Sequence, residues 1–359
     1  MEPSQPKFAF SKPSEPGFRA ATSPQFDISM KTISLRLIVN TLCLLLPAHC
    51  QAQVSLALSK TIPLPEIQGG FNHMSVDAGR QRLFVTATTK KTLEIIDLKS
   101  GKPWRGLTGD GPAAALFAPE FNQLYVTRGH NLCIYDGGTF DLLTTVDLQS
   151  GLDELQHDPN AKRLYVGCMT SNKTAIAIIG IPDGKRRGEI ALPAKPQGFV
   201  LEQKGNRIFA NIPSLSQIAV LDRDKQIPLA PWPLRDVSGN YPIALDEPNH
   251  RLFIGCRRPA QLVVFDATTG HQVATIPIAA DTDDLAYDPI HKRVYVACGD
   301  GSVDVVDQRD ADHYLLRGHI SVPPGSRNSV FSAESNQFYL AVPQRGNQPA
   351  EIRVFTPQK

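Results

Sequence analysis

The sequence lacks an apolar run long enough to cross a membrane. Its longest, LIVNTLCLLL at residues 37–46, is about half of the roughly 20 residues that a transmembrane helix needs. Lys31 and Arg36 precede this run and the small residues of CQA follow it at residues 50–52, as in a secretory signal peptide. We therefore expect a signal peptide at residues 30–52, a mature chain that starts near Gln53 without a transmembrane segment, and a periplasmic or secreted protein.

The segment before this signal peptide lacks hydrophobic periodicity. Residues 1–29 are rich in Pro and Ser, so we expect them to be disordered, or never translated if synthesis begins at Met30. The mature chain also lacks an excess of one charge sign. Residues 1–52 hold five of the 37 basic and three of the 35 acidic residues, which leaves a formal net charge of zero. This balance disfavours nucleic acid or an anionic membrane as the main partner.

Cysteine is scarce, and the sequence contains neither a CxxC pair for zinc nor a CxxCH motif for haem. The hydrolase motifs GxSxG and HExxH are missing as well, so no catalytic residue is assigned. Of the four cysteines after residue 52, Cys168, Cys256 and Cys298 occupy one position of the repeat described next, and Cys133 does not. Equivalent positions on neighbouring repeats are too far apart for a disulfide, so we expect buried thiols.

What the sequence has is a repeat of about 42 residues. Seven strand-like segments read RLFV, QLYV, RLYV, RIFA, RLFI, RVYV and QFYL, and their aromatic residues are 40 to 44 positions apart. These aromatics are Phe84, Tyr125, Tyr165, Phe209, Phe253, Tyr295 and Tyr339. Seven residues before each one stands a reference position, usually acidic, that opens a turn: Asp77, Ala118, Asp158, Glu202, Asp246, Asp288 and Ser332. Arg or Gln always stands two residues before the aromatic, and a second strand-like run such as LEIID or LVVFD follows it.

These units predict an all-β, seven-bladed β-propeller with four antiparallel strands per blade, in a single domain at residues 53–359. Each small sheet can bury its faces only against its neighbours, which favours a ring over a sandwich. The last unit ends at its third strand, EIRVF at residues 351–355, and SKTIPL at residues 59–64 is similar to the fourth strand of the fifth unit, VATIPI. We therefore expect the N-terminal strand to complete the last blade and close the ring.

Three segments of the chain resemble the YVTN-type repeat of YncE-like propellers. They are LFVTATTKKTLEIIDLKSGK at residues 83–102, LYVTRGHNL at residues 124–132 and RVYVACGDGSVDVVD at residues 293–307. The similarity extends over residues 54–359 and implies an exported seven-bladed propeller. It also implies DNA binding as one activity reported for some members of that family.

Strand alternation identifies the residues that should line the central channel. Positions two before the reference residue are mostly small or apolar. Polar residues gather at the positions four before it and, beside them, on the loops that enter the strands. We expect these residues to form a ligand site at one channel mouth: Asn72, His73, Asp153, Glu154, Asp283, Asp284, Arg327 and Asn328. Within this set, His73, Glu154 and Asp284 could hold a divalent cation. The alternative is that the polar residues only solvate a water-filled pore.

The residues outside the channel give no other site. Arg257 and Arg258 follow a strand and are expected to be solvated. The sequence therefore favours a monomeric, non-catalytic propeller that binds a protein or a small ligand at its channel mouth or on one face. A metal-dependent hydrolase resembling propeller lactonases, or a lyase, is the alternative, and a DNA-binding propeller is a lesser one.

Overall fold

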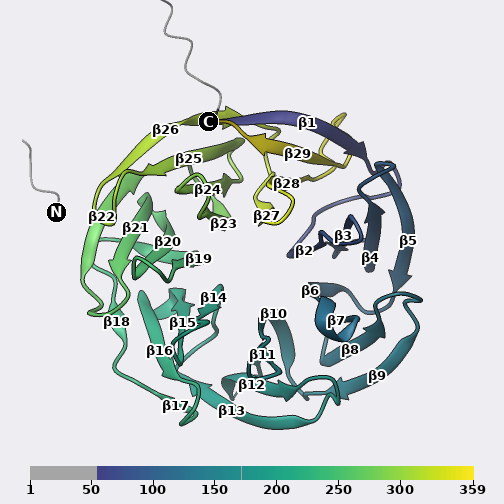
Figure 1. Ribbon diagram of the computed structural model, residues 1–359, viewed down its shortest axis with the longest axis horizontal. Helices are drawn as coiled ribbons and strands as arrows, with labels where there is room; N and C mark the ends of the chain where they lie inside the picture. The colour runs from purple at the N-terminus through teal and green to yellow at the C-terminus, as the bar shows by residue number, and fades with distance from the viewer. Residues whose placement is uncertain (1–54, 171) are drawn as a thin grey trace, which may run out of the picture. The chain divides into compact units, whose positions relative to one another are not determined.

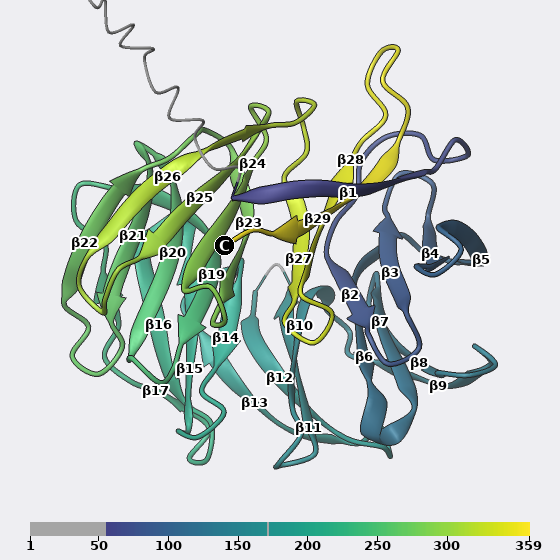
Figure 2. The same cartoon turned by 45° about the horizontal axis from the view of Figure 1, so that its top comes forward.

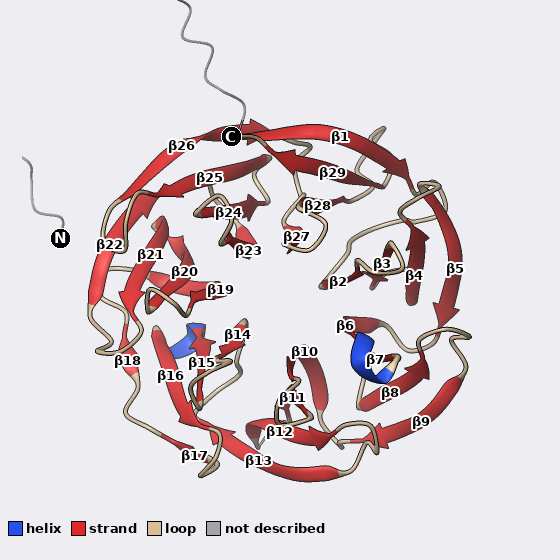
Figure 3. Ribbon diagram, viewed as in Figure 1, coloured by secondary structure: helices blue, strands red, loops and turns tan. Residues whose placement is uncertain are grey.

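The computed structural model describes residues 55–170 and 172–359. These residues form seven antiparallel sheets arranged as blades around a central channel, which confirms the predicted propeller (Figure 1). They contain no α-helix, only two short 3₁₀ turns, η1 (Pro119–Phe121) and η2 (Pro213–Leu215), drawn in blue in Figure 3. The segments expected to be disordered (1–29) and to form a signal peptide (30–52) lie outside the described residues.

Blades 1 to 3 each contain four strands, which follow one another from the channel outward. Blade 1 is β2 (Met74–Asp77), β3 (Arg82–Ala87), β4 (Thr92–Asp97) and β5 (Lys102–Thr108). Blade 2 is β6 (Pro112–Ala118), β7 (Gln123–Arg128), β8 (Asn131–Asp136) and β9 (Leu142–Asp147). Blade 3 is β10 (Gly151–Asp158), β11 (Arg163–Met169), β12 (Thr174–Gly180) and β13 (Arg186–Leu192).

Blades 4 to 6 follow the same plan, except that the outer strand of blade 4 is split in two. Blade 4 is β14 (Phe199–Leu201), β15 (Arg207–Ile212) and β16 (Gln217–Asp222), with β17 (Ile227–Pro228) and β18 (Trp232–Pro233) both paired to β16. Blade 5 is β19 (Ser238–Asp246), β20 (Arg251–Arg258), β21 (Ala260–Asp266) and β22 (Gln272–Pro277). Blade 6 is β23 (Thr282–Asp288), β24 (Arg293–Cys298), β25 (Ser302–Gln308) and β26 (Tyr314–Ser321).

Blade 7 joins the two ends of the described chain. Its inner strands are β27 (Asn328–Ser332), β28 (Gln337–Val342) and β29 (Glu351–Pro357), and its outer strand is β1 (Leu56–Pro63). β1 pairs antiparallel with β29, from Leu56 opposite Pro357 to Pro63 opposite Glu351 (Figure 2). The predicted closure by the N-terminal strand is confirmed.

The core lies between the blades, because each sheet packs its faces against the sheets on either side. The seven repeat aromatics lie on the second strand of each blade and are fully buried. Several of them contact an aromatic ring of the next blade, as Phe84 contacts Phe117 and Tyr295 contacts Phe338. Burying one such side chain contributes about 1.5–3 kcal/mol, so this position is a main source of stability.

The cysteine prediction is also confirmed. Cys133, Cys168, Cys256 and Cys298 are all buried and unpaired within the described residues. Burial raises the pKa of Cys168 and of Cys256 to about 11 and about 12, so these thiols stay protonated and unreactive at neutral pH. The described residues contain no helix with the length and apolar character of a membrane span.

Candidate functional site

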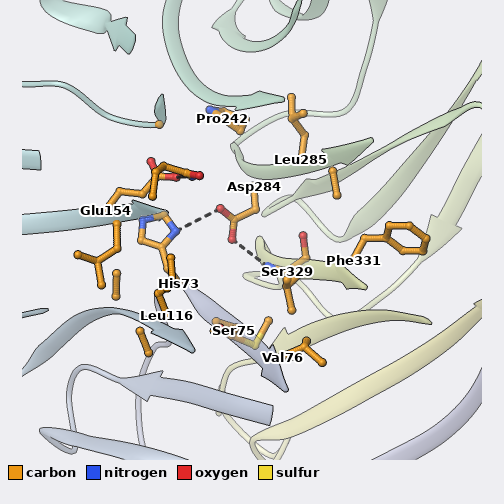
Figure 4. Close-up of a pocket in the computed structure, with 18 of the residues that line it drawn as sticks. His73, Ser75, Val76, Leu116, Glu154, Pro242, Asp284, Leu285, Ser329 and Phe331 are labelled. Atoms are coloured by element: carbon orange, nitrogen blue, oxygen red, sulfur yellow. Dashed lines mark hydrogen bonds and ion pairs between the residues drawn. The ribbon is translucent and has the colours of Figure 1, made fainter. Parts of the chain in front are cut away.

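A polar cavity of about 400 Å³ opens in the central channel (Figure 4). The innermost strands of the blades and the residues that enter them form its wall, and three ionisable side chains face it: His73, Glu154 and Asp284. Other parts of the wall are lined by small or apolar residues such as Ala114, Leu116 and Val330. This cavity is large enough for a small ligand such as a sugar or an organic acid.

Irregularities in the inner strands help to place the acidic residues. In β10 the pairing with β11 shifts between Leu152 and Leu155, so that Asp153 and Glu154 together oppose Gly167. In β23 the pairing shifts between Thr282 and Asp284. Such bulges change the direction of a side chain and interrupt the simple alternation of a strand. Consecutive carboxylates can therefore take part in different contacts around the same channel mouth.

His73 and Asp284 form the central ion pair of the cavity. The Nδ1 atom of His73 lies 3.5 Å from Oδ1 of Asp284, and Oδ2 of Asp284 accepts a 2.9 Å hydrogen bond from the Ser329 N–H. Burial alone would lower the pKa of His73. The hydrogen bond and charge of Asp284, followed by the charges of Glu154 and Asp153, outweigh burial and raise this pKa to about 10. The imidazole is therefore a cation at neutral pH.

Glu154 lies across the cavity in blade 3. Its Oε1 accepts a hydrogen bond from the Gln156 amide and its Oε2 accepts one from the Phe199 N–H, both at 3.0 Å. Burial raises the pKa of Glu154 to about 7, although the charge of His73 and these two hydrogen bonds oppose the rise. A carboxyl group with this pKa exchanges a proton readily at neutral pH, which is the property required of a general acid or base.

The edge of the mouth carries a separate network of charges. Asp283 accepts a 2.6 Å hydrogen bond from Arg257, and its second oxygen lies 3.4 Å from Nε of Arg327. Both arginines also pair with Asp281. The Arg257 guanidinium lies 3.7 Å from the centre of the Tyr241 ring, a cation–π contact. The prediction that Arg257 follows a strand and is solvated is wrong, because Arg257 belongs to β20 and contacts Asp281, Asp283, Tyr241 and the Thr282 carbonyl.

The structure brings together only part of the predicted set. His73, Glu154 and Asp284 line the cavity, whereas the other five are not among the residues that line it. Asn328 is buried beside Asp283 and Asp284, and Asp153 pairs with Lys195 at 3.2 Å. Asp153 and Asp283 were expected on the loops that enter the inner strands, but they lie within β10 and β23. Asn72 donates its backbone N–H to the Thr86 carbonyl.

Sequence reasoning missed several partners of these residues. The backbone N–H groups of Phe199 and Ser329 come from neighbouring blades, and a sequence pattern gives no sign of their direction. In residues 55–170 and 172–359, no group of three or more His, Cys, Asp or Glu side chains is arranged to hold a metal ion. A cation held by His73, Glu154 and Asp284 thus stays a prediction that this geometry does not support.

The fold and the site together define a seven-bladed β-propeller with an ionisable cavity in its channel. No family model matches the chain. Its sequence is 22% identical over 251 residues to 6-phosphogluconolactonase of Yersinia pestis, a match that covers 65% of this chain and 73% of that enzyme. An uncharacterized protein YncE of Salmonella typhimurium is 26% identical over 98 residues, which is 27% of this chain and 28% of that protein.

Solved structures agree with the fold at low sequence identity. A chain from the hydrazine synthase of Kuenenia stuttgartiensis matches with a TM-score of 0.68 and 14% identity, covering 76% of this chain and 93% of that one. A chain of a mitotic checkpoint complex matches with a TM-score of 0.71 and 14% identity, covering 94% and 99%. These similarities support the propeller architecture and carry no activity over to this chain.

Proposed function

We propose that this protein binds a small polar ligand in the mouth of its central channel. The observation that carries the proposal is the convergence of His73, Asp284 and Glu154, from three different blades, on one cavity of about 400 Å³. Partly buried charges of this kind cost stability unless they are paired, so their concentration around an open cavity favours recognition over simple packing.

The charges of the cavity indicate the chemistry of the ligand. Within the described residues the Nε2 atom of His73 has no hydrogen-bond partner, so it can donate to a ligand oxygen while Nδ1 faces Asp284. Glu154 can donate when protonated and accept when ionised, because its pKa is about 7. A ligand with hydroxyl and carbonyl or carboxyl oxygens, such as a sugar acid or its lactone, offers matching groups.

Binding can be tested with gluconate and glucono-δ-lactone as probes, by thermal shift and isothermal titration calorimetry. We expect a probe to raise the melting temperature of the wild type, and His73→Gln and Glu154→Gln each to weaken binding by about tenfold or more. His313→Gln is the matched control, because His313 also pairs with an aspartate, Asp310, but is exposed. Equal binding by all four proteins would refute a channel site.

A lactone hydrolase is the second candidate, favoured by the similarity to 6-phosphogluconolactonase and by the pKa of Glu154. Glu154 as a carboxylate would take a proton from the water that attacks the lactone carbonyl. The new carbon–oxygen bond forms, the ring ester bond breaks, and the proton passes to the departing alkoxide. The imidazolium of His73 would stabilise the negative charge on the carbonyl oxygen.

Acid release from glucono-δ-lactone, followed in a pH-stat, separates the two candidates. A hydrolase should exceed the spontaneous rate and lose most of that excess in Glu154→Gln. Repeating the assay with EDTA tests the predicted divalent cation, since a metal-dependent enzyme would lose activity. A rate equal to the spontaneous one, with binding intact, would leave the non-catalytic function.

We also propose that the protein is exported after cleavage near Gln53. N-terminal sequencing of protein recovered from the cell envelope or medium would test this. DNA binding stays the lesser alternative. It predicts association with a short duplex at low salt that weakens steeply as salt is added, and no association at low salt would remove it.

A further inference from the structure

A repeated arginine joins each of several blades to the next. It is the basic residue two positions before the repeat aromatic. Arg82 of blade 1 donates to the Gly137 carbonyl of blade 2 at 2.6 Å, and Arg207 of blade 4 donates to the Ala267 carbonyl of blade 5 at 2.6 Å. Arg251 and Arg293 also donate to a backbone carbonyl of the next blade. Arg293 contacts Gln358 of blade 7, and Arg251 contacts Ala311 in the loop between β25 and β26 of blade 6.

An acidic side chain supports the guanidinium in these four blades. Asp77 pairs with Arg82, and Glu202 pairs with Arg207 through both of its oxygens. In blades 5 and 6 the carboxylates are Asp266 and Asp307, which lie on the third strand and not at the reference position. The space between neighbouring blades is thus built to hold a planar cation between a carboxylate and backbone carbonyl groups.

Blade 7 has neither member of the pair that Asp77 and Arg82 form in blade 1 and that Glu202 and Arg207 form in blade 4. Gln337 stands at the arginine position and Ser332 at the acidic one. Blade 2 shows the same double replacement, with Gln123 and Ala118, but there Phe121 packs into the core and Glu120 pairs with His157 of blade 3 at 3.0 Å. The junction of blades 2 and 3 therefore has its own side chains in place of the missing pair.

The junction of blades 7 and 1 instead contains a cavity of about 370 Å³. Its lining comes from Ala78, Gln81 and Leu98 of blade 1 and from Glu334, Ser335, Gln337 and Tyr339 of blade 7. One carboxylate and no basic side chain belong to this lining. Burial raises the pKa of Tyr339, so its hydroxyl stays neutral, and it donates to the Gln337 amide oxygen at 2.7 Å.

We propose that this cavity between blades 7 and 1 is a binding site for a guanidinium group of a small molecule or of an arginine side chain. The ligand would take the place that an internal arginine takes in blades 1, 4, 5 and 6. Glu334 would supply the carboxylate, and Gln337, Ser335 and backbone carbonyls would supply the neutral acceptors.

Lys60 of β1 already contacts Leu98, one of the residues that line this cavity. Its Nζ donates to the Leu98 carbonyl at 2.8 Å, which corresponds to the carbonyl used by Arg82 and Arg207 at their junctions. Lys60 therefore links blade 7 to blade 1 from the outer strand and leaves the inner space open. A second lone pair on that carbonyl and the Glu334 carboxylate remain for a ligand.

The test uses Nα-acetyl-arginine amide as the probe and Nα-acetyl-citrulline amide as its neutral control, with affinities measured by isothermal titration calorimetry. We expect the arginine probe to bind about tenfold or more tightly than the citrulline probe. In Ser332→Asp/Gln337→Arg, which restores the internal pair, the arginine probe should no longer bind and the melting temperature should rise. Glu334→Gln should weaken binding about tenfold at an unchanged melting temperature, since Glu334 is exposed.

The variant Glu154→Gln distinguishes binding in this cavity from binding in the channel, which is also acidic. Binding of the arginine probe should be the same in this variant as in the wild type. Three results would overturn the proposal: no binding to the wild type, no preference over citrulline, or binding that survives in both Ser332→Asp/Gln337→Arg and Glu334→Gln. Binding lost only in Glu154→Gln would place the cation in the channel and would also overturn it.

Discussion

The charge of His73 depends on one neighbour more than on any other. Burial lowers the pKa of this imidazole, and the hydrogen bond and charge of Asp284 are the largest contributions that raise it. The ion pair therefore converts a residue that ordinarily titrates near neutral pH into one that is a cation there. The charge pattern presented to a ligand then depends mainly on the protonation of Glu154.

Replacing Asp284 should lower the pKa of His73. In Asp284→Asn we expect the pKa of His73 to fall from about 10, because the two largest contributions that raise it are removed while burial still lowers it. Glu154→Gln should lower it less, since Glu154 acts only through its charge. Titration followed by ¹H–¹⁵N correlation spectra of the imidazole would measure both. A neutral His73 at pH 8 in the wild type would contradict the ion pair.

Glu154 and His73 also make the stability of the folded protein depend on pH. Glu154 and His73 both bind a proton more tightly in the folded state, so their contributions are largest at low pH. The contribution of Glu154 is lost as pH rises from about 4.5 to about 7, and that of His73 as pH rises from 6.5 to about 10. The melting temperature of the wild type should therefore approach that of His73→Gln across pH 6.5–10.

A change of about 1 kcal/mol corresponds to about 2–4 °C in a large domain, so melting curves can resolve this convergence. His313→Gln is the control for loss of an imidazole outside the cavity. A constant difference between the wild type and His73→Gln over this pH range would show that His73 does not titrate with a raised pKa.

Alternation along a strand was enough to predict three of the site residues. His73, Glu154 and Asp284 all stand four positions before the reference residue of their repeat, and all three line the cavity. The bulges in β10 and β23 could not be predicted, because they depend on pairing with the next strand. For the same reason the sequence placed Asp153 and Asp283 on loops and left Arg257 without a partner.

The outer strand of blade 7 was predictable because its sequence resembles that of the outer strand of blade 5. SKTIPL near the N-terminus matches VATIPI, and β1 and β22 are both outermost strands. In β1, Leu56 is buried in a cluster shared by blades 6 and 7, and Ile62 is buried in a cluster shared by blades 7 and 1. These two residues therefore hold the ring closed together with the backbone hydrogen bonds.

Shortening one of these side chains should weaken the closure. We expect Ile62→Ala to lower the free energy of unfolding by about 2–5 kcal/mol, because Ile62 is fully buried and its loss leaves a cavity. Thr61→Ala is the matched control at an exposed position of the same strand and should change stability by less than about 0.5 kcal/mol. Equal effects of the two changes in urea unfolding would contradict a closing role for Ile62.

The ring as a whole owes its stability to the seven interfaces between blades and to no covalent link among the described residues. The four cysteines of these residues are buried, unpaired and spread over blades 2, 3, 5 and 6. The seven-fold repeat made this architecture predictable, since one 42-residue motif specifies every interface. The replacements that break the repeat, Gln337 and Ser332 in blade 7 and Gln123 and Ala118 in blade 2, mark the interfaces that differ.

Stability should accordingly be independent of reducing agent. We expect the same melting temperature with and without dithiothreitol at neutral pH. A decrease of several degrees in the reductant would reveal a disulfide that the described residues do not contain.

The pairing of β1 with β29 also determines how the ring would respond to mechanical force. Leu56 lies opposite Pro357, so both ends of the described chain leave the blade at the same end of one antiparallel pair. A pull on the two ends would load its hydrogen bonds one after another, as in opening a zipper, and not all at once in shear. A ring that is stable to heat can therefore open at low tension, beginning at blade 7.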